Sequence, residues 1–127
     1  MSKIRTLISS ALVIVGLAGT VRANDDLVLV FAGCAGRLSA EMEHAWLVSD
    51  ARADALQGQR ERFVAILQAI MPMDRARETL HHRVEAKLAH SAILTTARFG
   101  DDPRLSRLAK QQAQVQVQSC QAMLLDG

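Results

Sequence analysis

Aromatic residues and helix-breaking residues are scarce in this sequence. Its 127 residues include no tyrosine, one tryptophan, three phenylalanines and two prolines. Proteins that bind single strands of nucleic acid stack bases on aromatic side chains, so this scarcity disfavours a nucleic-acid partner. Polar and apolar residues alternate over no more than a few positions, and Pro72 and Pro103 stand where helices are expected to begin. The sequence therefore predicts an all-α fold.

Sequence signatures of catalysis are also missing. No glycine-rich phosphate-binding loop is present, and no serine lies at the sharp strand-to-helix turn that exposes a nucleophile. The two cysteines, Cys34 and Cys120, form no Cys-x-x-Cys-His motif for covalent haem attachment. We therefore expect that the protein is not an enzyme and carries no cofactor.

The segment over residues 1–23 has the features of an export signal. Lys3 and Arg5 precede an apolar run over 7–18, and Val21-Arg22-Ala23 supplies the positions that a signal peptidase reads. The run is too short for a membrane-spanning helix, which needs about 20 residues. We expect cleavage after Ala23, which leaves 24–127 as a single domain in a bacterial periplasm or outside the cell, with no transmembrane segment. The alternative is a buried N-terminal helix.

Removal of this segment changes the charge of the chain. The whole sequence has 15 lysines and arginines against 13 aspartates and glutamates. The loss of Lys3, Arg5 and Arg22 leaves 12 basic against 13 acidic residues, a net charge of −1. The mature chain therefore has no basic face of the kind that nucleic-acid-binding proteins present.

Cys34 admits two interpretations. The residues from Val30 to Cys34 resemble a lipobox, which would make the protein a lipoprotein anchored at Cys34, although Phe31 stands where an aliphatic residue is usual. In an oxidising compartment, a disulfide between Cys34 and Cys120 is the simpler expectation. That bond closes a loop of about 87 residues, which the chain-entropy model values at about 4–5 kcal/mol. We predict the disulfide, with lipidation as the alternative.

Four helices are expected, over residues 25–48, 51–71, 75–98 and 103–125. Each has an apolar stripe that repeats at steps of three and four residues. The stripes are Leu27, Phe31, Cys34, Leu38, Met42, Ala45 and Trp46; Leu56, Phe63, Ile66, Leu67 and Ile70; Ala76, Leu80, Val84, Leu88 and Ala92; and Leu105, Ala109, Ala113, Val117, Cys120 and Leu124. Asp74 and Asp102 are the expected N-caps of the last two helices. Gly58 weakens the second helix, so a loop over 57–62 is an alternative.

Short connections between four amphipathic helices favour a small antiparallel, up-down-up-down four-helix bundle. In this topology the start of the first helix faces the end of the last. At 1.5 Å per residue, Cys34 and Cys120 then lie within about one turn of the same level. The spacing therefore permits a disulfide between the first and last helices. Gly33 and Gly36 are expected to allow close helix packing beside it.

Two Glu-x-x-His pairs could bind a metal. Glu41 and His44 lie on the first expected helix and Glu78 and His81 on the third, and residues three apart share a helix face. Di-iron bundles combine two such motifs with a glutamate from each of the other two helices, which this chain does not supply in full. A single transition metal or a haem is therefore the alternative cofactor. The competing interpretation is a set of ordinary surface pairs such as His81 with Glu85.

Histidines of the third expected helix could form a proton-responsive patch. His81, His82 and His90 stand beside Glu78 and Glu85, and imidazole titrates near physiological pH. Acidification would add positive charge to such a patch. The alternative is that these are exposed helix residues without a role.

Trp46 stands near the end of the first expected helix. We expect it to close one end of the core, and the alternative is an exposed anchor for a partner, since tryptophan is over-represented at interaction hot spots. Together these features predict an exported, non-catalytic interaction or binding module whose partner is another protein. A metal- or haem-binding bundle is the alternative function.

Overall fold

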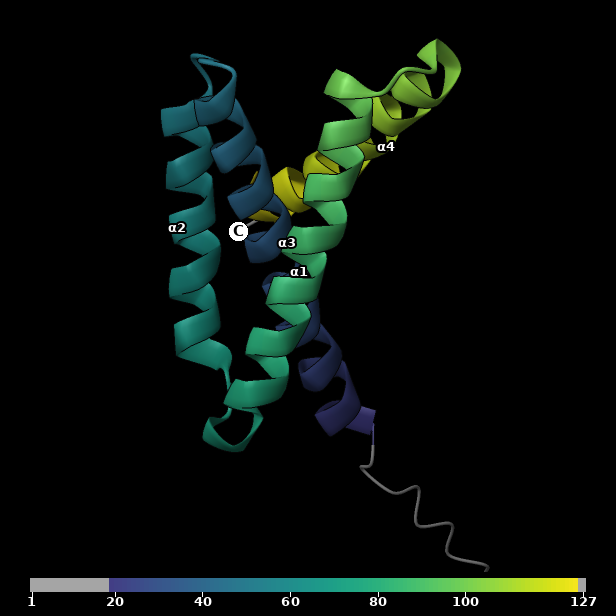
Figure 1. The fold of residues 1–127 in the computed structure, drawn as a ribbon. Helices are drawn as coiled ribbons and strands as arrows, with labels where there is room; N and C mark the ends of the chain where they lie inside the picture. The colour runs from purple at the N-terminus through teal and green to yellow at the C-terminus, as the bar shows by residue number, and fades with distance from the viewer. Residues whose placement is uncertain (1–18, 126–127) are drawn as a thin grey trace, which may run out of the picture.

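The computed structural model describes residues 19–125, and almost all of them are helical (Figure 1). The helices are α1 (Gly19–Leu47), α2 (Ala53–Ile70), α3 (Ala76–Phe99) and α4 (Pro103–Leu125), with a short 3-10 helix, η1 (Met73–Arg75). No strand occurs in this part of the chain. The helices run alternately up and down, so the predicted antiparallel four-helix bundle is confirmed.

The predicted export signal lies mostly outside the described residues. Residues 1–18 are not described, and α1 begins at Gly19, before the start at Asp25 that the sequence predicts. Cleavage after Ala23 would therefore fall within α1 and shorten it at its first end. That cleavage stays a prediction.

Helix α1 is the centre of the bundle. Between Ala32 and Met42 every residue except Arg37 is buried, and most of these residues are small. Small side chains let neighbouring helices approach from several directions at once. Helices α2 and α3 make the extensive contacts with α1, whereas α4 packs mainly on α3 and meets α1 at fewer positions. The apolar stripe predicted for this helix therefore understates its burial in the middle.

Gly36 marks a close approach between α1 and α3. A Cβ atom at this position would fall on the carbonyl oxygen of Arg83 and lie 3.0 Å from the backbone nitrogen of Lys87. At Gly33 the nearest atoms are side-chain nitrogens of Arg37, at 3.1 Å, and His82, at 3.5 Å. The predicted close packing is therefore confirmed at Gly36, where backbone meets backbone.

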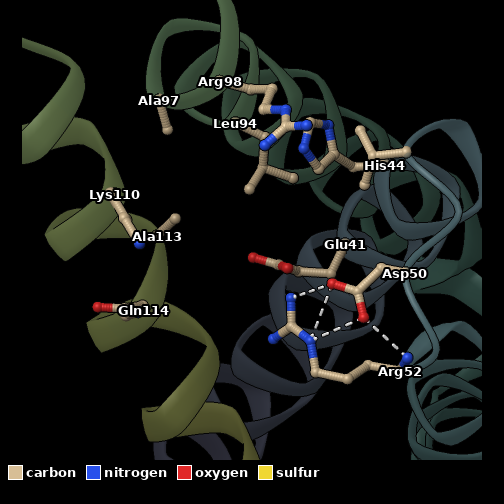
Figure 2. A pocket seen from close by; sticks show the side chains of 11 residues that line it. Glu41, His44, Asp50, Arg52, Leu94, Ala97, Arg98, Lys110, Ala113 and Gln114 are labelled. Carbon is tan, nitrogen blue, oxygen red and sulfur yellow. Dashed lines mark hydrogen bonds and ion pairs between the residues drawn. The ribbon is translucent and has the colours of Figure 1, made fainter.

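A tight turn joins α1 to α2. Ser49 has a left-handed backbone with φ of 57°, and the Asp50 backbone nitrogen donates to the carbonyl of Ala45 at 2.8 Å. The Asp50 carboxylate accepts the Arg52 backbone N–H at 2.9 Å and pairs with the Arg52 guanidinium at 2.8 Å (Figure 2). The break predicted at 49–50 is confirmed. Residues 57–62 are helical, so the loop considered for them is not formed.

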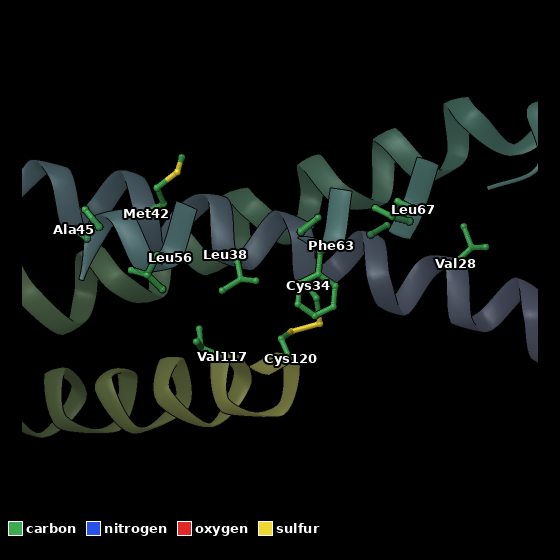
Figure 3. Packing of buried hydrophobic residues seen from close by; sticks show 13 residues of the cluster. Val28, Cys34, Leu38, Met42, Ala45, Leu56, Phe63, Leu67, Val117 and Cys120 are labelled. Atoms are coloured by element: carbon green, nitrogen blue, oxygen red, sulfur yellow. A yellow bond between two sulfur atoms is a disulfide. The ribbon is translucent and has the colours of Figure 1, made fainter. Parts of the chain in front are cut away.

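The main core lies between α1, α2 and the second half of α4 (Figure 3). Its larger buried members are Leu38, Leu56, Phe63, Leu67 and Val117. Cys34 and Cys120 are bonded within this cluster, with their Cα atoms 5.5 Å apart. The predicted disulfide between the first and last helices is therefore confirmed, and it ties α4 to the central helix.

The apolar stripe predicted for α3 is wrong. Its residues Leu80, Val84 and Leu88 are 60%, 44% and 64% exposed, and the buried residues of the helix are Thr79, His90 and Leu94. Residues spaced four apart drift by about 40° around a helix at each step, so a long run of them cannot stay on one face. Apolar residues occur on two faces of α3, and packing against α1 selects the other one.

Burial at the helix ends also differs from the prediction. Trp46 is 51% exposed and does not close the core. Leu27, near the other end of the described part of α1, and Leu105, in the first turn of α4, are exposed as well.

One of the two predicted N-caps is formed. The Asp102 carboxylate accepts the backbone N–H of Arg104 at 2.8 Å and of Leu105 at 3.2 Å, which caps α4 as expected. Asp74 instead lies inside η1, and α3 begins after Arg75 without a side-chain cap. The extra 3-10 turn follows Pro72, whose carbonyl accepts the Arg75 N–H at 3.1 Å.

Candidate functional site

A polar cleft of about 330 Å³ opens where the ends of α1 and α3 meet the first half of α4 (Figure 2). Leu94, Ala97 and Ala113 supply apolar walls. Charged and polar groups come from each of the three helices and from the α1–α2 turn. We call this cavity the polar cleft.

Glu41 connects the polar cleft to the interior of the bundle. Its Oε1 lies 2.8 Å from Nε2 of His90, whose side chain is fully buried. The other ring nitrogen of His90 lies 3.0 Å from Oε1 of Gln116 on α4. Three helices are thus joined by one buried polar network, in which every ring nitrogen has a partner. A buried polar group without a partner would be costly, so this network specifies how α1, α3 and α4 are oriented.

Asp50 and Arg52 form an ion pair at the edge of the polar cleft. Hydrogen bonds from the Arg52 side chain, and then from its backbone N–H, lower the pKa of Asp50 from 3.8 to about 2. The same side-chain bond raises the pKa of Arg52. Asp50 is therefore ionised at neutral pH, and the guanidinium is held in place at the edge of the cleft.

Two further cations face the polar cleft from its other walls. Arg98 extends from the end of α3 and Lys110 from α4 (Figure 2). His44 also lines the cleft, and its ring centroid is 6.3 Å from that of Phe99. The cleft combines two carboxylates with three basic side chains, so it can hold a small polar or charged group. It places no nucleophile beside a base.

The residues considered for a metal site are not brought together. Glu41 pairs with His90, and His44 lies a turn further along α1. Glu78 accepts two hydrogen bonds of 2.9 Å from Arg75, which lower its pKa, and His81 pairs with Glu85 at 3.3 Å on the surface. Within residues 19–125, no three His, Cys, Asp or Glu side chains are grouped so that they could hold a metal ion.

The histidines of α3 do not form one patch. His90 is buried against α1 and α4, whereas His81 is exposed and His82 faces α1 beside Gly33. Sequence reasoning placed Glu41 in a possible site but missed His90 as its partner. The two residues are 49 positions apart, and no local pattern marks the pair.

An apolar surface on α3 is the second candidate site. It consists of Leu80, Val84 and Leu88, which follow one another at steps of four along α3 and are exposed. We call these three residues the α3 ridge. Arg77, His81 and Glu85 lie exposed beside it, so both signs of charge surround an apolar centre. Interfaces between proteins commonly have this arrangement of apolar centre and polar rim.

No helix among the described residues is long and apolar enough to cross a membrane. No protein-family model, curated protein or solved structure matches this chain.

Proposed function

We propose that this protein is an exported, non-catalytic interaction module that binds a helix of another protein on the α3 ridge. The exposure of Leu80, Val84 and Leu88 carries the proposal. Full burial of a leucine or valine side chain is worth about 1.5–3 kcal/mol, so a partner that covers the ridge gains a substantial driving force. A row of side chains four apart fits between the corresponding rows of another helix, which favours a helical partner.

Exposed apolar residues occur elsewhere, so the clustering on the ridge is what matters. Val115 on α4 is 62% exposed, as Leu88 is, but its helical neighbours Gln111, Gln118 and Ser119 are polar. Single exposed apolar residues are normal on protein surfaces, whereas contiguous ones mark interaction sites. Val115 therefore provides a matched control.

The test compares Leu88→Glu with Val115→Glu. Both variants should fold, because both positions face solvent. We expect that the wild-type protein and Val115→Glu retain the same partner from a periplasmic extract, and that Leu88→Glu loses it. Cross-linking from position 84 should then reach a helix of that partner. Retention of the partner by all three proteins would contradict the proposal. A concentration-dependent dimer in sedimentation that Leu88→Glu abolishes would also contradict it, since the ridge would then serve self-association.

Export is the second part of the proposal. The disulfide between Cys34 and Cys120 supports it, because disulfides persist mainly in oxidising compartments. Expression of residues 1–127 in a bacterial host, followed by fractionation and intact-mass measurement, should yield a periplasmic or secreted chain that begins at Asn24. A chain that retains residues 1–23 in the cytosol would refute export, and a lipidated chain that begins at Cys34 would refute the proposed processing.

A further inference from the structure

A second cavity, separate from the polar cleft, lies between α2 and α3. The two helices both pack on α1 and diverge from their connection at η1 (Figure 1). A groove of about 270 Å³ lies between them. Val64, Leu67 and Met71 line it from α2, and Ala76 and Leu80 from α3. The volume is below the range of about 300–1,000 Å³ that is typical for drug-sized ligands, so the groove suits a single narrow apolar chain.

Thr79 adds an unsatisfied polar group to this apolar lining. The residue is 3% exposed, and its Oγ1 has no hydrogen-bond partner among the described residues. Buried hydroxyl groups almost always have a partner, because the loss of water without a replacement is unfavourable. Thr79 therefore offers a hydrogen bond that an occupant of the groove could take.

Arg83 lies one helical turn beyond Thr79 and lines the same groove. It is partly buried, and no hydrogen bond or ion pair joins its side chain to another described residue. Burial, and then the nearby charge of Arg60, lower the pKa of Arg83 because both disfavour its positive charge. Arg60 donates from Nε to the Ser39 hydroxyl at 3.0 Å, so it too has a neutral partner. Among the described residues, neither guanidinium is joined to a carboxylate by a hydrogen bond or an ion pair.

Glu43, an acid on the neighbouring helix α1, does not pair with these arginines. Glu43 accepts a hydrogen bond of 2.6 Å from Lys87, the next basic residue along α3. An anion supplied from outside would therefore meet an unmatched guanidinium at one end of an apolar groove. Arginine is well suited to bind a carboxylate, since its planar fork can donate two parallel hydrogen bonds.

We propose that the groove between α2 and α3 binds a medium-chain fatty acid, with its carboxylate on Arg83 and the Thr79 hydroxyl and its chain directed towards Met71 and Ala76. The two ends of the groove differ in chemistry, as the two ends of a fatty acid do. The apolar lining covers the chain, and the cation and the hydroxyl hold the head group. This site is independent of the α3 ridge apart from Leu80, which borders both.

Isothermal titration calorimetry with sodium decanoate, below its micelle concentration, tests the proposal on the full mature chain. We expect saturable binding at one site. Arg83→Gln should weaken it by about tenfold or more, since a hydrogen bond to a charged group is lost. Arg62→Gln removes an exposed charge from α2 outside the groove and should leave binding unchanged. Arg83→Lys retains the charge and should recover part of the affinity if the loss in Arg83→Gln is electrostatic.

Three further measurements separate the parts of the ligand and of the site. Decanol has the chain without the charge and acetate has the charge without the chain, so both should bind more weakly than decanoate. Thr79→Val should lower the affinity for decanoate without lowering the melting temperature, because it removes a hydroxyl that has no partner in the free protein. Leu88→Glu should bind decanoate as the wild type does.

Several outcomes would overturn the proposal. These are the absence of binding to the wild type, equal binding of decanol and decanoate, and equal weakening by Arg83→Gln and Arg62→Gln. Circular dichroism of each variant establishes that it is folded. If Arg83→Gln is not folded, the affinities of Arg83→Lys and Thr79→Val for decanoate are compared with that of Arg62→Gln. Equal affinities in all three variants would overturn the proposal.

Discussion

Two glycine-to-alanine substitutions in helices should change stability in opposite directions. Gly36 lies in the middle of α1 against the backbone of α3, whereas a Cβ added at Gly58 in α2 would meet no atom within 4 Å apart from its own stretch of helix backbone. Alanine is favoured over glycine inside a helix by about 0.5–1 kcal/mol, and this gain is available at both positions. Only at Gly36 does the added methyl group meet an obstacle.

The size of the effect at Gly36 follows from the nature of that obstacle. The methyl group would overlap the carbonyl oxygen of Arg83, which belongs to the helix backbone and cannot rotate away as a side chain can. Overpacking of a well-packed interior costs about 1–3 kcal/mol, and a backbone obstacle places Gly36→Ala at the upper end. After the gain in helix propensity, we expect a net destabilisation of about 2 kcal/mol. For a domain of this size that lowers the melting temperature by about 10 °C.

Urea denaturation of both variants, followed by circular dichroism, measures these values. Gly58→Ala should raise the free energy of unfolding by about 0.5–1 kcal/mol with an unchanged m-value. Gly36→Ala should lower it, and the ion pair between Glu43 and Lys87 at the same interface should be disturbed. If Gly36→Ala stabilises the protein as Gly58→Ala does, the close approach of α1 and α3 does not exist and the packing described above is wrong.

The disulfide, the Glu41–His90 hydrogen bond and the Asp50–Arg52 ion pair should each contribute to stability. Cys34 and Cys120 are separated by 86 positions, so reduction of their disulfide should lower the free energy of unfolding measured in urea by up to about 4–5 kcal/mol. The end of α4 should then be less protected from hydrogen exchange. A loss below about 1 kcal/mol would contradict this prediction. His90→Leu should lower the free energy of unfolding by about 3 kcal/mol, because it leaves the Glu41 carboxylate without its buried partner. The double variant with Glu41→Leu should recover much of that loss, whereas additive losses would show that the two residues are not coupled. The pKa of Asp50 is lowered in the folded state to about 2. The contribution of its ionised carboxylate to the stability of the folded state is therefore complete above pH 4 and is lost as the pH falls towards 2. The difference in melting temperature between the wild type and Asp50→Asn should therefore shrink over that interval and stay constant above it.

Local patterns were sufficient for the elements of this fold. Helices form from residues that are three and four apart, so their number and approximate limits could be predicted without knowledge of the tertiary structure. The N-cap at Asp102 also depends only on its immediate neighbours. The disulfide could be predicted because the chain contains only two cysteines, and the topology placed them at a similar level.

The orientation of the helices was decided only by the tertiary structure. Helix α3 has apolar residues on two faces, and periodicity alone cannot select the face that meets α1. The contact of Gly36 with the backbone near Arg83 makes that choice, and it leaves Leu80, Val84 and Leu88 in solvent.

The same choice created both cavities and the buried polar network. It turned His90 towards Glu41, across 49 positions of sequence, and set Arg83 and Thr79 along the groove beside α2. By itself the sequence determined an all-α chain with one cross-link, because those features depend on local spacing and on the count of cysteines. The sites depend on which faces of rigid helices meet, and that is a property of three-dimensional packing.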